Sequence, residues 1–265
     1  MKIPVYSLKG EVKKNVDIAR VFSETVREDL IRRAVSAEQA AKRQPYGVDP
    51  LAGKRTSAHY HGRRGIRHSM MNREMARMKR IHHPGFLYMT ARFVPQAVKG
   101  RKAHPPKAEK IWKKKINKKE RLKALFSALS ATIKKDLVLS RGHKIKSIKH
   151  LPLVLEDKFQ EIKRVKKVRE VLEKFGFSEE LERIKEKKVR AGKGKNRGRK
   201  HKKKRGPLII ISEDKGIFRA ARNIPGIEVT EVENLTVEKL APGSKPGRLC
   251  IWTESALTKL ENIGE

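Results

Sequence analysis

The chain has 265 residues and a formal net charge of +37, with 66 Lys or Arg against 29 Asp or Glu. A charge of this size indicates a polyanionic partner, because its self-repulsion opposes compaction of the free chain. There is no run of about 18 apolar residues and no basic amphipathic helix with a Trp/Leu face, so we do not expect a membrane partner. Nucleic acid is the favoured polyanion. The single cysteine, Cys250, excludes a disulfide framework and a zinc site built on cysteines.

The N-terminal region predicts a short strand followed by a helix. Residues 3–8 have the pattern of a strand, and Gly10 ends it in a turn. From Asp17, which we expect to cap the next element, apolar residues recur at helical spacing as far as Val35. An Ala-rich stretch continues this pattern to Lys42, and Pro45 stops it.

A long basic segment without regular apolar spacing follows. Between Lys42 and Lys115 the sequence holds twenty Lys or Arg, three acids and six of the fourteen aromatic residues. Gly and Pro are scattered through it, so neither a long helix nor a sheet can persist. Arginine mixed with Tyr, Phe and His is the composition that phosphate pairing and base stacking require. We expect residues 44–115 to form an extended loop that becomes ordered only when it packs into nucleic acid.

The rest of the chain predicts strands that alternate with helices. The apolar, β-branched stretch at residues 207–212 is typical of a parallel strand covered on both faces. Other expected strands are at residues 137–139, 151–155, 229–232 and 249–252. Expected helices begin after Asn117, run from 159 to 175 with Gly176 at the end, start again at Glu179, lie at 217–222 and 237–240, and begin at Glu254.

This alternation predicts an α/β fold with a mostly parallel open sheet, flanking helices and right-handed connections. A second, shorter basic segment at residues 185–205 has thirteen basic residues and one acid. From Gly206 to the end the chain has seven basic and nine acidic residues, so the positive charge is segregated. We therefore expect a globular domain made of residues 1–43 and 116–265, interrupted by the basic insertions 44–115 and 185–205.

The Gly-rich run at residues 192–198 resembles a nucleotide-binding loop only in composition. The dinucleotide fingerprint needs a glycine where Arg197 stands, and the phosphate-loop pattern needs Gly-Lys-Ser/Thr, which is absent. The run also precedes the apolar strand, whereas a phosphate loop follows one. We favour a flexible basic segment that lies against phosphates over a cofactor loop or a solvated disordered loop, and we predict no cofactor.

Nine histidines raise the question of a metal site. The candidates are His59, His61 and His68 and the pair His82 and His83. No carboxylate lies at ligand spacing, and no His-x-x-x-His pattern falls on a helix. Within an arginine-rich loop, stacking on bases or contact with phosphate is the favoured interpretation, and we predict no metal site.

Catalytic carboxylates are also not indicated. Glu213 and Asp214 follow the apolar strand at the edge where an α/β active site would lie. The favoured interpretation is a helix cap, with an acid placed at the positive end of the helix dipole. Cys250 and Trp252 lie in an apolar strand and are expected in the core. We predict no enzymatic activity.

Several uncommon stretches of the sequence resemble one known family over essentially the whole chain. Residues 92–107, RFVPQAVKGRKAHPPK, look like the end of the long internal loop of large ribosomal subunit protein four, in its archaeal and eukaryotic branch. Matching stretches follow the same order along the chain: KRT at 54–56, AARN at 220–223, LAPG at 240–243 and GRLCIWTESA at 247–256.

This resemblance implies a structural RNA-binding protein of the large ribosomal subunit, working in the cytoplasm within the ribosome and supporting subunit assembly. In that family the globular domain lies on the outside of the subunit and the long loop threads into ribosomal RNA. The loop tip contributes to the narrow part of the polypeptide exit tunnel. The implied partners are large-subunit ribosomal RNA, neighbouring large-subunit ribosomal proteins and the nascent polypeptide near the loop tip, with no membrane.

Arginine forks can bridge phosphates from different RNA helices, and aromatic rings can stack on splayed bases. The residues predicted to contact RNA are the basic ones of the two insertions. They are Arg55, Arg63, Arg64, Arg67, Arg73, Arg77, Arg80, Arg92, Lys99, Arg101, Lys102, Lys193, Lys195, Arg197 and Arg199. Those nearest the tunnel are expected between about Tyr60 and Phe93.

Two other functions stay open at this point. A free RNA-binding regulator would need a self-contained reading module, and the sequence has no recognition-helix, zinc or aromatic-sheet signature. A nucleotide-dependent α/β enzyme acting on RNA would need a phosphate loop after a strand, and that pattern is missing.

Overall fold

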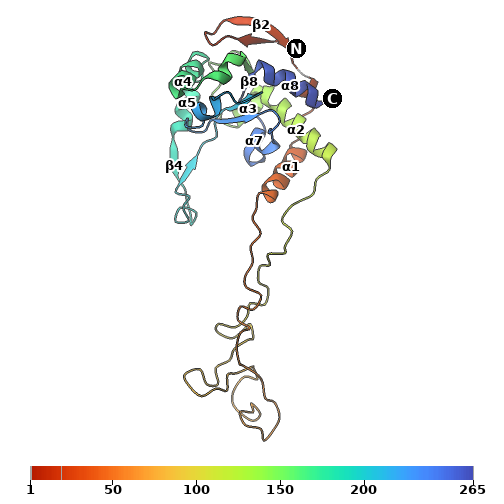
Figure 1. The fold of residues 1–265 in the computed structure, drawn as a ribbon, viewed down its shortest axis with the longest axis vertical. Coiled ribbons are helices and arrows are strands. Elements are labelled where there is room, and N and C mark those ends of the chain that lie inside the picture. The colour runs from red at the N-terminus through yellow and green to blue at the C-terminus, as the bar shows by residue number, and fades with distance from the viewer. Residues whose placement is uncertain (1, 19, 265) are drawn as a thin grey trace. The chain divides into compact units, whose positions relative to one another are not determined.

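The computed structural model describes residues 2–18 and 20–264. The chain divides into two compact units, one made of Met1–Lys42 together with Lys114–Glu265 and the other of Arg43–Lys113. The first is an α/β unit (Figure 1). The second, which we call the basic loop, contains no helix or strand longer than an isolated bridge within its described residues. Among the described residues, no helix is long and apolar enough to cross a membrane.

The α/β unit is built on a six-stranded sheet with the order β2-β1-β3-β8-β6-β7. Only β1 and β2 pair antiparallel; the other neighbours are parallel. The predicted α/β class with a mostly parallel sheet is therefore confirmed. The strands are β1 (Lys2–Tyr6), β2 (Val12–Asp17), β3 (Leu153–Leu155), β6 (Leu208–Ile211), β7 (Glu228–Glu231) and β8 (Cys250–Thr253).

Helices cover both faces of this sheet and enclose two hydrophobic cores. The α-helices are α1 (Glu28–Ala41), α2 (Lys118–Ile133), α3 (Lys135–Ser140), α4 (Val165–Lys174), α5 (Ser178–Lys185), α6 (Ile217–Ala221), α7 (Val237–Leu240) and α8 (Glu254–Gly264). Short 3-10 helices are η1 (Arg20–Ser23), η2 (Asp157–Glu161) and η3 (Pro242–Ser244).

Strand β6 shows why its sequence is apolar without interruption. Leu208 and Ile210 enter one core, while Ile209 and Ile211 enter the other. Successive side chains of a strand point to opposite faces, so a strand covered on both sides needs apolar residues at every position. The first three residues of neighbouring β8 follow the same rule, and Trp252 and Cys250 are buried as predicted.

The predicted strand at residues 137–139 is wrong, because these residues belong to the helix α3. Val138 is fully buried whereas Leu139 is 49% exposed, so only one face of this short segment packs inward. A run of three apolar residues fits a buried strand and a helical turn equally well, and periodicity cannot separate the two.

The predicted helix from Asp17 is also wrong in its first half. Asp17 ends strand β2, and the helix α1 begins only at Glu28. The predicted single helix at 159–175 is split into η2 and α4. Its end is as expected: Gly176 has φ 82° and donates its backbone N–H to the carbonyl of Glu173 at 3.1 Å, which closes the last turn.

The second basic segment forms a hairpin. Strand β4 (Lys187–Val189) pairs antiparallel with β5 (His201–Lys203), and Arg190 continues the pairing through its N–H to the carbonyl of Lys200 at 2.8 Å. The expectation of a segment without regular structure is therefore wrong at its two ends, where Lys- and Val-containing stretches pair in register.

Candidate nucleic-acid interface

The basic loop concentrates positive charge. Arg43–Lys113 contains seventeen Lys or Arg against three acids, Asp49, Glu74 and Glu109. Within the described residues only one ion pair uses such an acid, at 2.6 Å between Arg55 and Asp49. Among the described residues, the acids of the loop therefore neutralise little of this charge, which favours an anionic partner.

Aromatic stacking joins the two limbs of the basic loop near its ends. The rings of Tyr46 and Trp112 stack with centroids 5.6 Å apart, and the guanidinium of Arg43 lies 3.7 Å from the Trp112 ring. Gly47 approaches the other limb so closely that a Cβ there would lie 2.6 Å from the backbone nitrogen of Ala108. The limbs are thus held side by side by close backbone contact and a cation–π pair.

Isolated bridges organise the middle of the loop. His59 and Arg80 exchange backbone hydrogen bonds of 3.1 and 3.0 Å, and Arg80 also bridges to Ala91. The guanidinium of Arg80 donates to the carbonyls of Met89 at 2.8 Å and Ala76 at 2.9 Å. This arginine, which the sequence predicted as an RNA contact, is used to hold the loop's own turns together.

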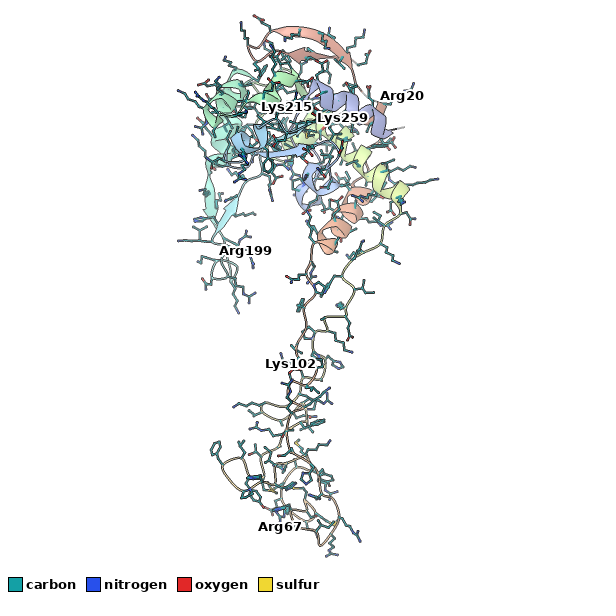
Figure 2. All side chains as sticks on the ribbon, viewed as in Figure 1. Arg20, Arg67, Lys102, Arg199, Lys215 and Lys259 are labelled. Carbon is teal, nitrogen blue, oxygen red and sulfur yellow. The ribbon has the colours of Figure 1, made fainter. Side chains whose placement is uncertain are left out.

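Arg92 is engaged in the same way, because its guanidinium donates to the carbonyl of Val98 at 2.6 Å. Arg80, Arg92 and Arg101 are half-buried. The other predicted residues present exposed side chains, as an interface requires. They are Arg55, Arg63, Arg64, Arg67, Arg73, Arg77, Lys99, Lys102, Lys193, Lys195, Arg197 and Arg199. Figure 2 marks Arg67, Lys102 and Arg199 among them.

The hairpin carries the second group of predicted residues. Arg199 lies towards the end of the hairpin that is remote from the sheet (Figure 2). The backbone N–H of Arg199 donates to the carbonyl of Gly194 at 3.1 Å, and the side chain of Arg190 donates to the carbonyl of Arg199 at 3.0 Å. These bonds order the turn while Lys193, Lys195 and Arg197 stay exposed.

A groove beside the hairpin adds basic residues that sequence reasoning missed. Arg141, Arg183 and Lys245 line it together with Lys188 and Lys202 of the two hairpin strands. Arg141 donates to the carbonyl of Pro242 at 2.9 Å, and burial together with the neighbouring Arg248 lowers the pKa of its guanidinium to about 10. At neutral pH it stays charged. These residues are far apart in the sequence, so no local pattern could have identified them.

The remaining candidates have structural roles. Oδ1 of Asp214 accepts the backbone N–H of Gly216 at 2.9 Å and of Phe218 at 3.1 Å, so it supports the start of α6 as predicted. Glu213 pairs with Lys259 at 3.4 Å. Burial raises the pKa of the Cys250 thiol to about 12, so it is a core side chain rather than a nucleophile.

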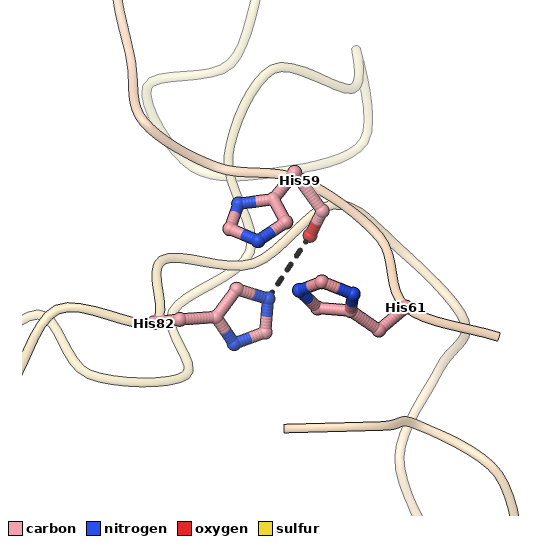
Figure 3. Close-up of side chains that lie close together, drawn as sticks. All are labelled: His59, His61 and His82. Atoms are coloured by element: carbon pink, nitrogen blue, oxygen red, sulfur yellow. Dashed lines mark hydrogen bonds between the residues drawn. The ribbon is translucent and has the colours of Figure 1, made fainter. Parts of the chain in front are cut away.

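The histidines of the loop are brought together more closely than the sequence indicated. One ring nitrogen each of His59, His61 and His82 lies within 4.8 Å of the others (Figure 3). His68 stands next to this cluster, with its ring 5.0 Å from that of His82 and its Nδ1 2.9 Å from the hydroxyl of Tyr88. The grouping depends on the bridge between His59 and Arg80, which no sequence spacing reveals.

Sequence comparison with known proteins gives a family match. Residues 16–263 match the ribosomal protein L4/L1 family. The chain belongs to that family. It is 43% identical to large ribosomal subunit protein uL4 of Methanosphaera stadtmanae over 263 residues, covering 99% of this chain and 97% of the relative.

Two further archaeal relatives bear the same name. The protein of Nanoarchaeum equitans is 46% identical over 264 residues, covering 98% of this chain and 97% of the relative. That of Methanopyrus kandleri is 46% identical over 267 residues, covering both chains completely. The resemblance seen in the sequence motifs is thereby confirmed, and the family is one of structural, non-enzymatic ribosomal proteins.

Proposed function

We propose that this chain is a structural component of the large ribosomal subunit, in the cytoplasm within the ribosome, and that it binds large-subunit ribosomal RNA. The observation that carries this proposal is the segregation of charge. Seventeen basic and three acidic residues are gathered in Arg43–Lys113, and thirteen more basic residues lie in the hairpin region 185–205. The archaeal relatives are named as large-subunit proteins, which supports the choice of RNA.

Exposed aromatic and apolar side chains of the basic loop support contact with bases as well as phosphates. Phe86 is 100% exposed, and Tyr60 and Tyr88 are 42% and 44% exposed. A fully exposed phenylalanine ring has no apolar contact in water, whereas stacking on an unpaired base buries one face of the ring. In the proposed complex, guanidinium forks bridge phosphates while these rings stack on splayed bases.

The hairpin and its groove form a second RNA contact on the α/β unit. Arg141 and Arg183 line the groove with guanidinium groups held by backbone carbonyls, and Lys245 and the hairpin lysines add longer, flexible side chains. Fixed charges suit one phosphate geometry, and flexible ones adapt to neighbouring phosphates. We infer that the α/β unit packs on RNA through this face and meets neighbouring large-subunit proteins elsewhere, thereby supporting subunit assembly.

The part of the basic loop between about Tyr60 and Phe93 is proposed to lie at the polypeptide exit tunnel, near the nascent chain. Membership of the family and the exposed Phe86 and Tyr88 in this part support the proposal. Neither catalysis nor a nucleotide cofactor belongs to the proposed function, since the acids at Glu213 and Asp214 are engaged in an ion pair and a helix cap.

Site-specific photo-crosslinking in assembled subunits tests this proposal. A photoreactive residue replaces Phe86, and as a matched control Phe218, a phenylalanine that is 44% exposed on α6. Position 86 is expected to crosslink ribosomal RNA, and also the nascent chain when translation is stalled. Position 218 is expected to give no crosslink to the nascent chain. Absence of RNA crosslinks from position 86 in intact subunits would refute the proposed binding mode.

A further inference from the structure

The histidine cluster of the basic loop has the donor set of a metal site. We propose that His59, His61 and His82 bind a transition-metal ion of the zinc class, which joins the stretch around residue 60 to the stretch around residue 82. This proposal is independent of RNA binding, because it concerns side chains that face one another within the loop. Their ring centroids lie 4.3, 4.4 and 5.0 Å apart (Figure 3).

The backbone already holds the three residues in register. The paired hydrogen bonds between His59 and Arg80, 3.1 and 3.0 Å long, fix the two stretches against each other. The carbonyl of His61 accepts the N–H of Met70 at 3.0 Å, and Met70 is only 1% exposed. These backbone hydrogen bonds hold the imidazoles near one another, so binding an ion would need little further ordering of the loop.

Hydrogen bonds set the tautomers in a way that suits metal binding. Nδ1 of His59 lies 3.0 Å from the carbonyl oxygen of Ser57. A carbonyl can only accept, so Nδ1 carries the proton and Nε2 keeps its lone pair. Metal-binding histidines commonly donate their second nitrogen to a backbone carbonyl in this manner, which orients the ring.

His82 provides a second, independent observation. Its Nε2 lies 3.2 Å from the carbonyl oxygen of His59 and must donate, while its buried Nδ1 has no hydrogen-bond partner among the described residues. A buried polar atom without a partner is uncommon in folded proteins and points to a missing ligand. Turning the His82 ring over gives up its hydrogen bond to the carbonyl of His59 and presents the lone pair of Nδ1 to the other two histidines.

The distances allow coordination after a small adjustment. Zinc binds imidazole nitrogen at about 2.0–2.1 Å in tetrahedral geometry, which places ligand nitrogens about 3.4 Å apart. The nitrogens here lie within 4.8 Å of one another, so side-chain rotation has to close a gap of at most about 1.4 Å. Three imidazoles with an open fourth position are a known zinc donor set.

The donor atoms determine which kind of ion can bind, and the surrounding charge determines how tightly it binds. Hard cations such as Mg²⁺ prefer oxygen ligands, and this cluster offers nitrogen only. Neutral imidazoles do not offset the charge of the ion, and seventeen basic residues of the loop oppose it. We therefore expect weaker binding than at a cysteine site, in the micromolar range, and selectivity for borderline metals such as Zn²⁺ and Co²⁺.

The test is a titration of the metal-free full-length chain with Zn²⁺ by calorimetry, in phosphate-free buffer. Co²⁺ absorption serves as a second readout because its visible bands change when the hydrated ion enters a protein site with fewer ligands. The wild-type chain is expected to bind one ion, and His61→Ala to bind it at least about tenfold more weakly. His83→Ala is the matched control. The Nδ1 of His83 lies 2.8 Å from the carbonyl oxygen of Pro84, and among the described residues His83 is not part of the cluster, so the affinity of this variant should equal that of the wild type.

Three results would overturn the proposal. Equal isotherms for the wild type and His61→Ala would mean that the rings serve stacking or phosphate contact only. Equal losses in His61→Ala and His83→Ala would mean diffuse binding to surface histidines rather than a built site. Titration with Mg²⁺ should give no heat of binding, and binding as tight as that of Zn²⁺ would exclude a nitrogen-coordinated ion.

Discussion

Neutralising the end of the hairpin tests the proposed phosphate contacts quantitatively. In the quadruple variant, Lys193, Lys195, Arg197 and Arg199 become Ala. All four side chains are exposed, and none is in an ion pair within the described residues, so their removal should leave the fold intact. Each phosphate contact contributes about 0.7 to 0.9 to the slope of log affinity against log salt concentration. Four contacts therefore predict a slope that is shallower by about 3.

That slope change has a large effect on measured affinity. When salt rises about fourfold, the wild-type affinity should fall about sixty times further than the affinity of the neutral variant. The assay is filter binding of the full-length chain to large-subunit ribosomal RNA over a salt series. The control variant exchanges Lys for Arg and Arg for Lys at the same four positions and keeps the charge. Its slope should match the wild type.

The reasoning would be refuted if the neutral and wild-type chains had the same slope. The end of the hairpin would then be a solvated extension that touches no phosphate. Urea unfolding of both variants checks that the difference does not come from a loss of folded protein, because the two should unfold at the wild-type midpoint.

Three further predictions concern the supports of these surfaces. Arg248→Met should lower the free energy of unfolding by about 3 kcal/mol, because the buried guanidinium donates to the carbonyl of Gly206 at 3.0 Å and to the carboxylate of Glu228 at 2.7 Å. An unchanged midpoint of urea unfolding would contradict this. Burial lowers the pKa of His143, so the free energy of unfolding should have its full value above about pH 6.5 and fall as the pH drops below it. In His143→Gln this part of the pH dependence should disappear, and its persistence would contradict the assignment. Gly100→Ala should impair incorporation of the chain into subunits without changing the unfolding of the α/β unit, because the added Cβ would collide with the carbonyl of Val94. Normal incorporation, measured by sedimentation, would contradict this prediction.

The sequence predicted the sheet well where burial alone determines the pattern. Residues 208–211 and 250–252 are apolar at every position because both faces of the strands are covered, and both were recognised. The segment 137–139 was misassigned because three apolar residues carry no period. The start of α1 was placed too early because Val21 and Phe22, which are buried from the 3-10 helix η1, fall at helical spacing ahead of it.

The candidate interface was predictable as a composition but not as a geometry. Counts of Arg, Gly and aromatic residues identified the basic loop, since these reflect what RNA contact requires. They could not show that Arg80 and Arg92 bond to the loop's own carbonyls, nor that Arg141 joins the hairpin groove. The convergence of the histidines likewise depends on long-range pairing around residue 80, which local sequence does not encode.

The most direct test of the central claim is sedimentation of the chain from cell extract through a high-salt gradient. Weak electrostatic binders dissociate in salt, because each phosphate contact steepens the loss of affinity. A chain whose basic loop is embedded in folded ribosomal RNA should still sediment with the large subunit. Recovery of the chain at the top of the gradient, with intact subunits below it, would contradict the account and favour a peripheral RNA-binding regulator.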